Sequence, residues 1–218
     1  MEIKLTDAQR TFVTGDSDKR LLLGGRQVGK TTALAVDALD NATDGNQVAL
    51  TAPRHEMAVT AFERVRRLAY QRPWVGRTLE DTRTRLSFVG GGSIEPVTVS
   101  SLVDPQLGHS PCINEFDHVA VDEGDRIDPD QFDACSRLDG NDGPESVTVV
   151  GTPRTESPNL KLLTQLNDWF TVYQRTGGLK DAWRSVENAR EEFGAVQTAT
   201  ELDGLFVTDP ADYADAVY

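Results

Sequence analysis

The sequence predicts an α/β fold in which helices flank a central, mostly parallel sheet. Short apolar segments, each bounded by turn-forming residues, alternate with longer segments whose apolar residues recur at helical spacing. In addition, a glycine-rich turn joins the first of these strands directly to a helix. With 218 residues, the chain is long enough to bury a core of its own. We therefore expect one α/β domain over residues 1–195, followed by an acidic tail or linker over residues 196–218.

Four segments are expected to form the core of the sheet, because each is short, apolar and followed by glycine, proline or polar residues. They are residues 20–23, 47–52, 118–121 and 147–150. A hairpin of edge strands is expected at residues 85–89 and 94–99, on either side of a Gly-Gly-Gly-Ser turn.

Helices are expected where apolar residues follow a 3.6-residue period. A short helix opens at Asp7 with Thr6 as its N-cap, and a second helix runs from Lys30 to about Leu39. The later helices are expected at residues 55–70, 158–170 and 181–193.

The charge composition indicates the conditions in which the protein works. It has 35 acidic and 22 basic residues, a formal net charge of −13, and only 5 lysines among the basic residues. An acidic, lysine-poor surface keeps a protein soluble in concentrated salt, so we expect a halophilic source. Near 1 M salt the Debye length is about 3 Å, so the negative net charge does not exclude DNA as a partner.

Two kinds of site are not expected from the sequence. No apolar stretch is long enough to cross a bilayer, so no membrane partner is predicted. The two cysteines and three histidines are scattered and lack the paired spacing of a zinc site.

Positive charge is concentrated between residues 54 and 85. This segment holds eight arginines and four acidic residues, a net charge of +4, in a chain that is otherwise strongly acidic. The cluster predicts a surface that contacts the phosphates of double-stranded DNA, although a solvated helix face would have the same composition. The residues predicted to contact DNA are Arg64, Arg66, Arg67 and Arg72.

The strongest motif is the segment from Gly24 to Thr31, which fits the phosphate-loop (Walker A) pattern G-x-x-x-x-G-K-[ST]. Its glycines let backbone N–H groups turn toward the phosphate oxygens of ATP, at the positive end of the following helix. Lys30 then reaches the β- and γ-phosphates, and the Thr31 hydroxyl binds Mg²⁺. The residues of this loop predicted to bind nucleotide are Gly24, Gly25, Arg26, Gln27, Val28, Gly29, Lys30, Thr31 and Thr32.

A pair of acidic residues, Asp122 and Glu123, follows the strand at residues 118–121. At this edge of a parallel sheet, Asp122 lies where the Mg²⁺ ion of a phosphate loop sits, usually through water. Glu123 is then placed to act as the general base on the attacking water. Acidic pairs are common in acidic proteins. This pair indicates a magnesium and catalytic site because a phosphate loop precedes it by about ninety residues.

Two further residues are candidates for contacts with the nucleotide, and each also has a purely structural explanation. Thr152 follows the strand at residues 147–150 and is a candidate sensor of the γ-phosphate, although an ordinary turn after a strand explains the same residues. The Gln9 amide precedes the phosphate loop and is a candidate reader of the adenine edge, although a helix cap explains it equally well.

Together these motifs resemble the ATPase domain of terminase large subunits, the DNA-packaging motors of tailed viruses. The segment from Arg26 to Thr32 is similar to the phosphate loop of that family, in which an arginine precedes Q-x-G-K-T. Asp122 and Glu123 match the acidic pair of the family, and the resemblance extends from about residue 3 to about residue 195. The remaining motifs that look like those of the family are Leu5 to Gln9 (adenine), Thr51 to Pro53 (helicase-type), Leu86 to Ile94 (hairpin, with Gly91 in place of an asparagine) and Gly151 to Pro153 (coupling).

The resemblance implies a P-loop NTPase fold of the additional-strand, catalytic-glutamate type. It also implies DNA-stimulated, Mg²⁺-dependent ATP hydrolysis by a homo-oligomeric ring, expected to be a pentamer. The ring would dock on the portal protein of a procapsid in the host cytoplasm, with the small terminase subunit as a further partner. Given the composition, the source is expected to be a virus of a halophilic archaeon.

Within this resemblance, Arg26 would be the phosphate-loop arginine that stabilises charge on the transferred phosphoryl group from the same subunit. For an arginine supplied by a neighbouring subunit, the sequence leaves four candidates open. They are Arg77, Arg83, Arg85 and Arg154.

One departure from the family concerns the nuclease. Members usually continue into an RNase H-like domain, which needs further strands and a cluster of metal-binding acids. The acids after Gly194 are expected to lie in a solvated tail, so DNA cleavage is not predicted. Two other functions stay open: a helicase-like DNA-dependent ATPase, and a nucleotide-switched binding module without motor activity.

Overall fold

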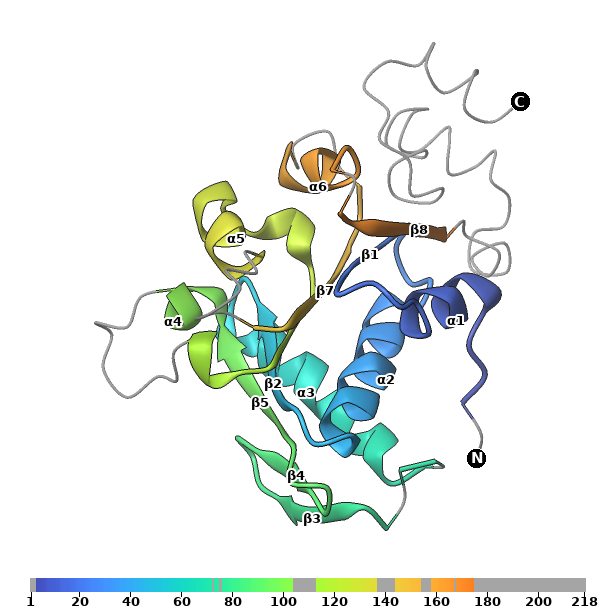
Figure 1. Ribbon diagram of the computed structural model, residues 1–218, viewed down its shortest axis with the longest axis vertical. Coiled ribbons are helices and arrows are strands. Elements are labelled where there is room, and N and C mark those ends of the chain that lie inside the picture. Colours follow the sequence, from blue (N-terminus) through green and yellow to red (C-terminus); the bar gives the residue numbers. More distant parts are fainter. Residues whose placement is uncertain are drawn as a thin grey trace.

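The helices and strands form three layers, with one sheet between two layers of helices (Figure 1). The computed structural model describes residues 3–71, 73–74, 76–103, 113–136, 144–153, 158–166 and 168–174. The strands are β1 (Lys19–Gly24), β2 (Gln47–Ala52), β3 (Thr78–Asp81), β4 (Leu86–Phe88), β5 (Ser93–Thr98), β6 (His118–Val121), β7 (Ser146–Gly151) and β8 (Phe170–Gln174). The helices are α1 (Asp7–Val13), α2 (Lys30–Thr43), α3 (His55–Ala69), α4 (Val99–Val103), α5 (Pro129–Ser136) and α6 (Pro158–Leu163), with 3₁₀ turns η2 (Ile113–Glu115) and η3 (Gly124–Arg126).

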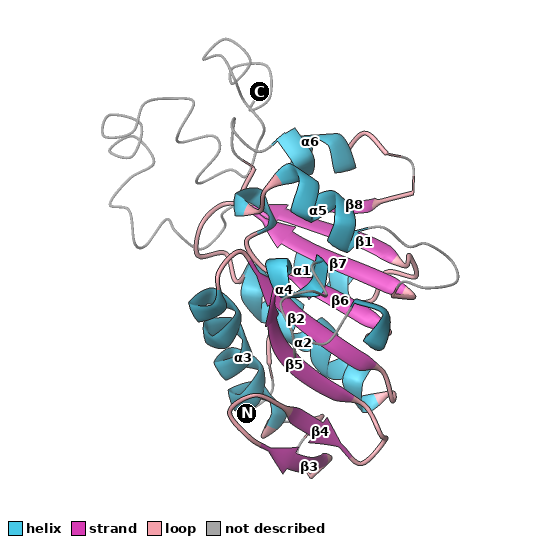
Figure 2. Ribbon diagram, turned by 90° about the vertical axis from the view of Figure 1, so that its left-hand side faces the viewer, coloured by secondary structure: helices cyan, strands magenta, loops and turns pink. Residues whose placement is uncertain are grey.

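The strands form a single sheet in the order β3-β4-β5-β2-β6-β7-β1-β8. From β5 to β8 every neighbouring pair is parallel, whereas β3 and β4 are antiparallel additions at one end (Figure 2). The carboxyl ends of β6, β7 and β1 therefore lie side by side at the same edge of the sheet. This is the edge at which α/β proteins bind their ligands. The predicted α/β fold is confirmed.

Each parallel strand contributes side chains to two hydrophobic cores, because successive residues of a strand point to opposite faces. In β1, Leu22 packs in the core formed with α1, α2 and α3, whereas Leu21 and Leu23 pack in the core formed with α4, α5 and α6. All three leucines are fully buried. Figure 1 shows the two groups of helices on opposite sides of the sheet.

Most of the expected elements form where the sequence predicts them. The strands expected at residues 20–23, 47–52, 118–121 and 147–150 correspond to β1, β2, β6 and β7. Thr6 caps α1 in a reciprocal capping box with Gln9, as the sequence predicts. Helix α2 continues to Thr43, beyond its predicted end near Leu39, because Ala42 still packs in the core.

The prediction of two edge strands between residues 85 and 99 is wrong in part. β4 and β5 form the expected hairpin, but β5 lies inside the sheet between β4 and β2. The edge is formed by β3, for which the sequence shows no clear strand signal. Because β4 pairs with β5 at Ser93 and Ile94 and no further, the later part of β5 has an open side, where Pro96 is tolerated. Val99 begins α4 instead of ending the strand.

The helix predicted from Pro158 to Phe170 is also wrong in its second half. α6 ends at Leu163, and Phe170 opens β8, which pairs in parallel with β1. The apolar residues of this segment fit a helical period, but β8 buries Val172 and Gln174 while Tyr173 between them is 48% exposed. That alternation is the signature of a strand with one covered face.

Two other predictions lie outside the described residues: the helix at 181–193 and the tail at 196–218. Within the described residues, every helix is too short or too polar to span a bilayer.

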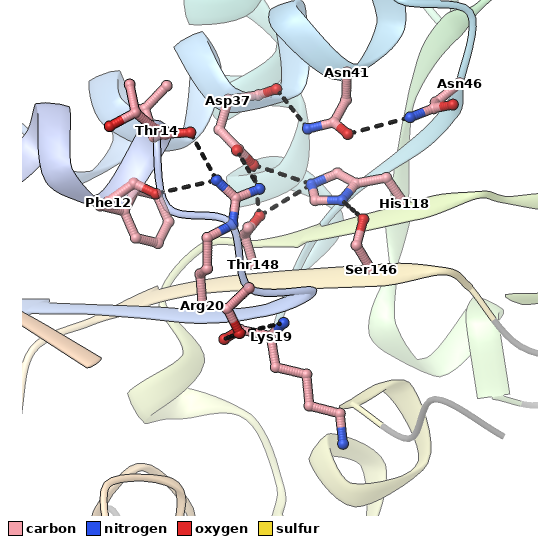
Figure 3. A network of polar contacts seen from close by, with 12 residues as sticks. Phe12, Thr14, Lys19, Arg20, Asp37, Asn41, Asn46, His118, Ser146 and Thr148 are labelled. Atoms are coloured by element: carbon pink, nitrogen blue, oxygen red, sulfur yellow. Dashed lines mark hydrogen bonds and ion pairs between the residues drawn. The ribbon is translucent and has the colours of Figure 1, made fainter. Parts of the chain in front are cut away.

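A cluster of buried polar side chains joins α2 to the middle of the sheet (Figure 3). The carboxylate of Asp37 in α2 forms an ion pair with Arg20 of β1, with 2.8 Å between Oδ1 and Nη2. Its other oxygen, Oδ2, lies 3.0 Å from His118 Nε2 of β6 and accepts a hydrogen bond of 2.9 Å from the Thr148 hydroxyl of β7. On its other side, His118 Nδ1 lies 2.6 Å from the Ser146 hydroxyl oxygen. The network connects α2 to three neighbouring strands.

The charges of this network compensate one another. Burial raises the pKa of Asp37, but His118 and Arg20 outweigh burial and hold that pKa below its ordinary value. Arg20 also donates to the carbonyl oxygens of Phe12 and Val13, at 3.0 and 2.8 Å, which ties the end of α1 to the same network. A buried ion pair with complete partners contributes little net stability, but removal of one partner leaves the other charge uncompensated.

The destabilisation caused by removing one partner of an ion pair can be compared between a buried and an exposed pair. Asp37 and Asp168 form such pairs with adjacent residues of β1. We expect Asp37→Ala to lower the free energy of unfolding by about 3–5 kcal/mol, because Arg20 stays buried without its carboxylate. The control is Asp168→Ala, which removes an ion pair of the same length, 2.8 Å, between a 58% exposed Asp168 and Lys19, and is expected to cost less than about 1 kcal/mol. Urea unfolding followed by circular dichroism measures both. Equal losses would show that the buried network does not hold the fold together.

Candidate active site

The phosphate loop joins the end of β1 to the start of α2, and its backbone depends on glycine at two positions. Gly29 has a φ of 86°, and a Cβ there would lie 2.7 Å from Gln9 Nε2. A Cβ on Gly24 would lie 2.9 Å from the carbonyl oxygen of Gln174. Between them, Gln27 also has a left-handed conformation, with a φ of 59°. The loop is therefore held in a shape that most side chains would not permit.

Two glutamine side chains hold the loop from outside. Gln9 Nε2 and Gln174 Nε2 both donate to the carbonyl oxygen of Val28, at 2.8 and 3.0 Å. Gln9 Oε1 accepts a hydrogen bond from the backbone of Thr6 at 2.9 Å. The helix-cap interpretation of Gln9 is thus confirmed, and its adenine role stays a prediction. Gln174 was not recognisable in the sequence, because its position depends on β8.

The amino group of Lys30 is surrounded by oxygen acceptors. Nζ donates to the carbonyl oxygens of Gly24 and Gly25, at 3.0 and 2.7 Å, and to the Thr152 hydroxyl at 3.1 Å. The backbone N–H of Thr152 in turn donates to Asp125 Oδ1 at 3.0 Å. The sequence predicted Thr152 as a phosphate sensor, and the structure places it beside the phosphate-loop lysine.

Thr31 and Asp122 lie side by side at the starts of their respective helix and loop. The Thr31 hydroxyl lies 3.0 and 3.2 Å from the two carboxylate oxygens of Asp122. Burial, together with the negative charge of Glu123, raises the pKa of Asp122 to about 6, although Thr31 and Lys30 lower it. A buried carboxylate that is costly to ionise is stabilised by a nearby cation.

The Thr31 and Asp122 pair fits the predicted magnesium ion. Hydroxyl and carboxylate oxygens are hard ligands of the kind that Mg²⁺ prefers, and it binds through one or two of them while keeping several waters. In the described part of the chain, no three His, Cys, Asp or Glu side chains gather into a cluster that holds a metal by itself. The donor set is therefore too small for a closed zinc site and suits magnesium that also contacts substrate phosphates.

Glu123 is held in a strained conformation beside this pair. Its φ is 54°, and it turns the chain from β6 into η3. Among the described residues, Glu123 and Gln27 are the two non-glycine residues with positive φ, and strain of this kind concentrates at functional sites. The Glu123 carboxylate lies 3.1 Å from Nε of Arg126. Arg126 was not identified as a site residue from the sequence, although its position three residues after Glu123 is a signal for such a pair.

A cavity of about 440 Å³ opens between the phosphate loop and Glu123. It combines cationic groups, hydroxyl groups and one carboxylate, which suits a polyphosphate. Its lining unites the predicted residues Arg26, Gln27, Gly29, Lys30, Thr31, Thr32, Glu123 and Thr152, and adds Arg64 and Arg126.

The four arginines predicted to contact DNA occupy different surroundings. Arg64 of α3 lines the cavity just described. Arg66 faces elsewhere and forms ion pairs with two carboxylates, one of them Asp81 at 2.6 Å. Arg67 is exposed, and Arg72 lies outside the described residues. The segment is therefore not one uniform basic surface.

The sheet order, the phosphate loop and the acidic strand end define a P-loop NTPase fold. Among solved structures, the chain is similar to the large terminase ATPase domain of Thermus phage P74-26, with 19% identity, 94% of each chain covered and a TM-score of 0.66. It is also similar to the large terminase of a thermophilic bacteriophage, with 14% identity over 94% of this chain and 54% of that one, and a TM-score of 0.71. For the large terminase of bacteriophage HK97, the identity is 16% over 99% of this chain and 47% of that one, with a TM-score of 0.63.

Identities this low establish the shared fold. Neither a protein-family model nor a curated protein matches the sequence. The chain spans nearly the whole of the phage ATPase domain, but about half the length of the other two terminase chains. Other structures of the thermophilic phage protein were solved in complex with ADP and with ATP-γ-S.

The raised pKa of Asp122 predicts an effect on stability in the absence of metal and nucleotide. Because the folded protein binds the Asp122 proton more tightly than the unfolded chain, stability falls as the pH rises from about 4 to about 6, by a total on the order of 3 kcal/mol. We expect Asp122→Asn to be more stable than the original chain at pH 7.5 in EDTA. The difference should shrink at pH 5, where Asp122 is protonated in the folded state. Urea unfolding at both pH values checks this, and a difference independent of pH would contradict it.

Proposed function

We propose that the chain is the ATP-hydrolysing motor domain of a viral large terminase, which moves double-stranded DNA into a capsid. One observation carries this proposal: Lys30, Thr31 and Glu123 line a single cavity of about 440 Å³. Asp122 lies 3.0 Å from the Thr31 hydroxyl. The fold that holds these groups is also that of the phage terminase ATPase domains.

Lys30 and the backbone of the phosphate loop would bind the β- and γ-phosphates in this cavity. An incoming phosphate oxygen would replace the carbonyl oxygens that Lys30 Nζ now contacts at 2.7 and 3.0 Å, as charge-assisted bonds to phosphate are stronger. Arg26 lines the same cavity and would stabilise negative charge on the transferred phosphoryl group. Thr152 would report the presence of the γ-phosphate through its contact with Lys30.

Glu123 would act as the general base. Its carboxylate would take a proton from a water molecule as the water oxygen forms a bond to the γ-phosphorus. The bond from that phosphorus to the β–γ bridging oxygen breaks, which gives ADP and inorganic phosphate. Thr31 and Asp122 would hold Mg²⁺, which neutralises charge on the β- and γ-phosphate oxygens when it is bound.

The proposal includes the partners that a packaging motor requires. These are double-stranded DNA, further copies of the chain in a pentameric ring, the portal protein and the small terminase subunit. The site of action would be a procapsid in the host cytoplasm, and the acidic, lysine-poor composition favours a virus of a halophilic archaeon. Cleavage of DNA would require a nuclease beyond the ATPase domain.

Steady-state hydrolysis of ATP, with and without duplex DNA, separates the candidate functions. A motor is expected to hydrolyse ATP faster when duplex DNA of any sequence is added. Nucleotide binding without turnover would instead indicate a switched binding module. Stimulation by single-stranded DNA alone would indicate a helicase-like ATPase, so either result would overturn the packaging proposal.

Two substitutions test the assigned roles of the base and the lysine. Glu123→Gln keeps the shape of the side chain but removes its basicity, so kcat is expected to fall by about 10²-fold or more while ATP affinity is retained. Lys30→Ala is expected to weaken ATP binding itself, because the cavity loses its central cation. Turnover by single-turnover kinetics and affinity by fluorescent-nucleotide titration distinguish the two. Persistent turnover in Glu123→Gln would mean that another group is the base.

A further inference from the structure

A second cavity, of about 280 Å³, adjoins the nucleotide cavity on the side of α3. Thr31, Arg64 and Glu123 line both cavities, so the two spaces share a wall of catalytic and cationic groups. Asp122 lines the second cavity as well. This space therefore lies beside the position at which the γ-phosphate of ATP would be cleaved.

One face of α3 forms the opposite wall of the second cavity. Its residues recur at intervals of three or four positions, with Thr60 and Ala61 adjacent, which places them on one face of the helix. They are Met57, Thr60, Ala61, Arg64 and Arg67. Arg66 lies on a different face, where it pairs with Asp81 and Glu63. The helix thus directs Arg64 and Arg67 toward the cavity and Arg66 toward two carboxylates.

The two arginines at the cavity keep donor capacity for an anion. In the described part of the structure, no hydrogen bond or ion pair engages the guanidinium of Arg64. Arg67 uses Nε to donate to the backbone carbonyl of Glu63 at 3.2 Å, which leaves its terminal nitrogen atoms for other acceptors. Guanidinium groups bind phosphate oxygens through paired hydrogen bonds.

The charge of the cavity suits a dianion once magnesium is bound. Arg64 and Arg67 balance Asp122 and Glu123, so the four side chains sum to zero. Thr31 and Asp122 fit a divalent cation, as argued above, and such an ion makes the sum +2. Inorganic phosphate carries nearly two negative charges near neutral pH, and the Thr60 hydroxyl adds a further donor.

We propose that this second cavity binds the inorganic phosphate released from ATP, with Arg64, which lines both cavities, contacting the phosphate before and after cleavage and Arg67 holding it after cleavage. The inference rests on the proposed ATPase function. A phosphate of the DNA backbone offers the same chemistry, but the cavity shares its wall with Thr31 and Glu123, which places it next to the nucleotide. Release of ADP and of phosphate would then follow different routes.

The test measures phosphate binding directly, separately from turnover. Inorganic phosphate is titrated into the complex of the whole chain with ADP and Mg²⁺, and the heat of binding is recorded. Arg67→Gln keeps the methylene stem but removes the charge, and is expected to weaken phosphate binding about tenfold. ADP affinity should be unchanged, because Arg67 does not line the nucleotide cavity. The matched control, Arg66→Gln, removes the same charge from the adjacent position of α3, about 100° around the helix, where the side chain pairs with Glu63 and Asp81. It should leave phosphate affinity within about twofold.

Arg64→Gln provides the second variant, because Arg64 borders both cavities. It should weaken phosphate binding and slow ATP hydrolysis as well. Folding of every variant is checked by circular dichroism. Affinity of a duplex DNA for each variant is measured in parallel, so that a DNA phosphate is distinguished from free phosphate.

Three results would overturn the inference. They are phosphate binding by Arg67→Gln equal to that of the original chain, equal losses in Arg66→Gln and Arg67→Gln, and a loss of DNA affinity without a loss of phosphate affinity. A chain that hydrolyses ATP but shows no saturable phosphate binding would also reject the phosphate site while leaving the ATPase intact. A chain that binds phosphate in this manner but fails to hydrolyse ATP would reject the proposed function instead.

Discussion

The carboxylate of Asp37 connects the elements that position the residues of the candidate active site. It binds side chains of β1, β6 and β7 at distances of 2.8 to 3.0 Å, and each of those side chains lies four residues before a residue of the site. Four residues of strand span about 13 Å, and an even spacing places both residues on the same face of the sheet. Lys30 lies seven residues before Asp37, two turns along the same side of α2. The three pairs are Arg20 and Gly24, His118 and Asp122, and Thr148 and Thr152.

A polar network fixes the position of α2 on the sheet more strictly than an apolar core does, because a shift in register breaks its ion pair and hydrogen bonds. If α2 moved by one turn, Leu34 and Ala38 could find other apolar neighbours, whereas Asp37 would leave Arg20 buried and unpaired. Ion pairs of this kind add little net stability, but they disfavour alternative arrangements. The contacts between the start of α2 and the end of β7 require an accurate register, since Lys30 Nζ donates to the Thr152 hydroxyl at 3.1 Å.

The parts of the site that the sequence predicted are those encoded in a single short segment. The phosphate loop carries its own backbone requirements, and Asp122 and Glu123 follow directly after an apolar strand, so a local pattern locates them. Asp37 and His118 are 81 positions apart, and neither has a distinctive neighbourhood in the sequence, so their pairing appears with the tertiary structure. The same holds for Gln174, whose strand is defined by pairing with β1, since its apolar residues also fit a helix. Likewise, charge counting groups the arginines of α3 together, whereas the period of the helix separates them.

The contacts of Lys30 suggest how the site would transmit the arrival and loss of a phosphate. Its amino group donates to two carbonyl oxygens of the loop and to the Thr152 hydroxyl. A triphosphate would compete for the same three donors, since Lys30 has three N–H groups. Thr152 is also bound through its backbone to Asp125, at the start of η3 and two residues after Glu123. Lys30 is therefore linked by a short series of hydrogen bonds, through Thr152 and Asp125, to the turn that positions Glu123, the proposed general base.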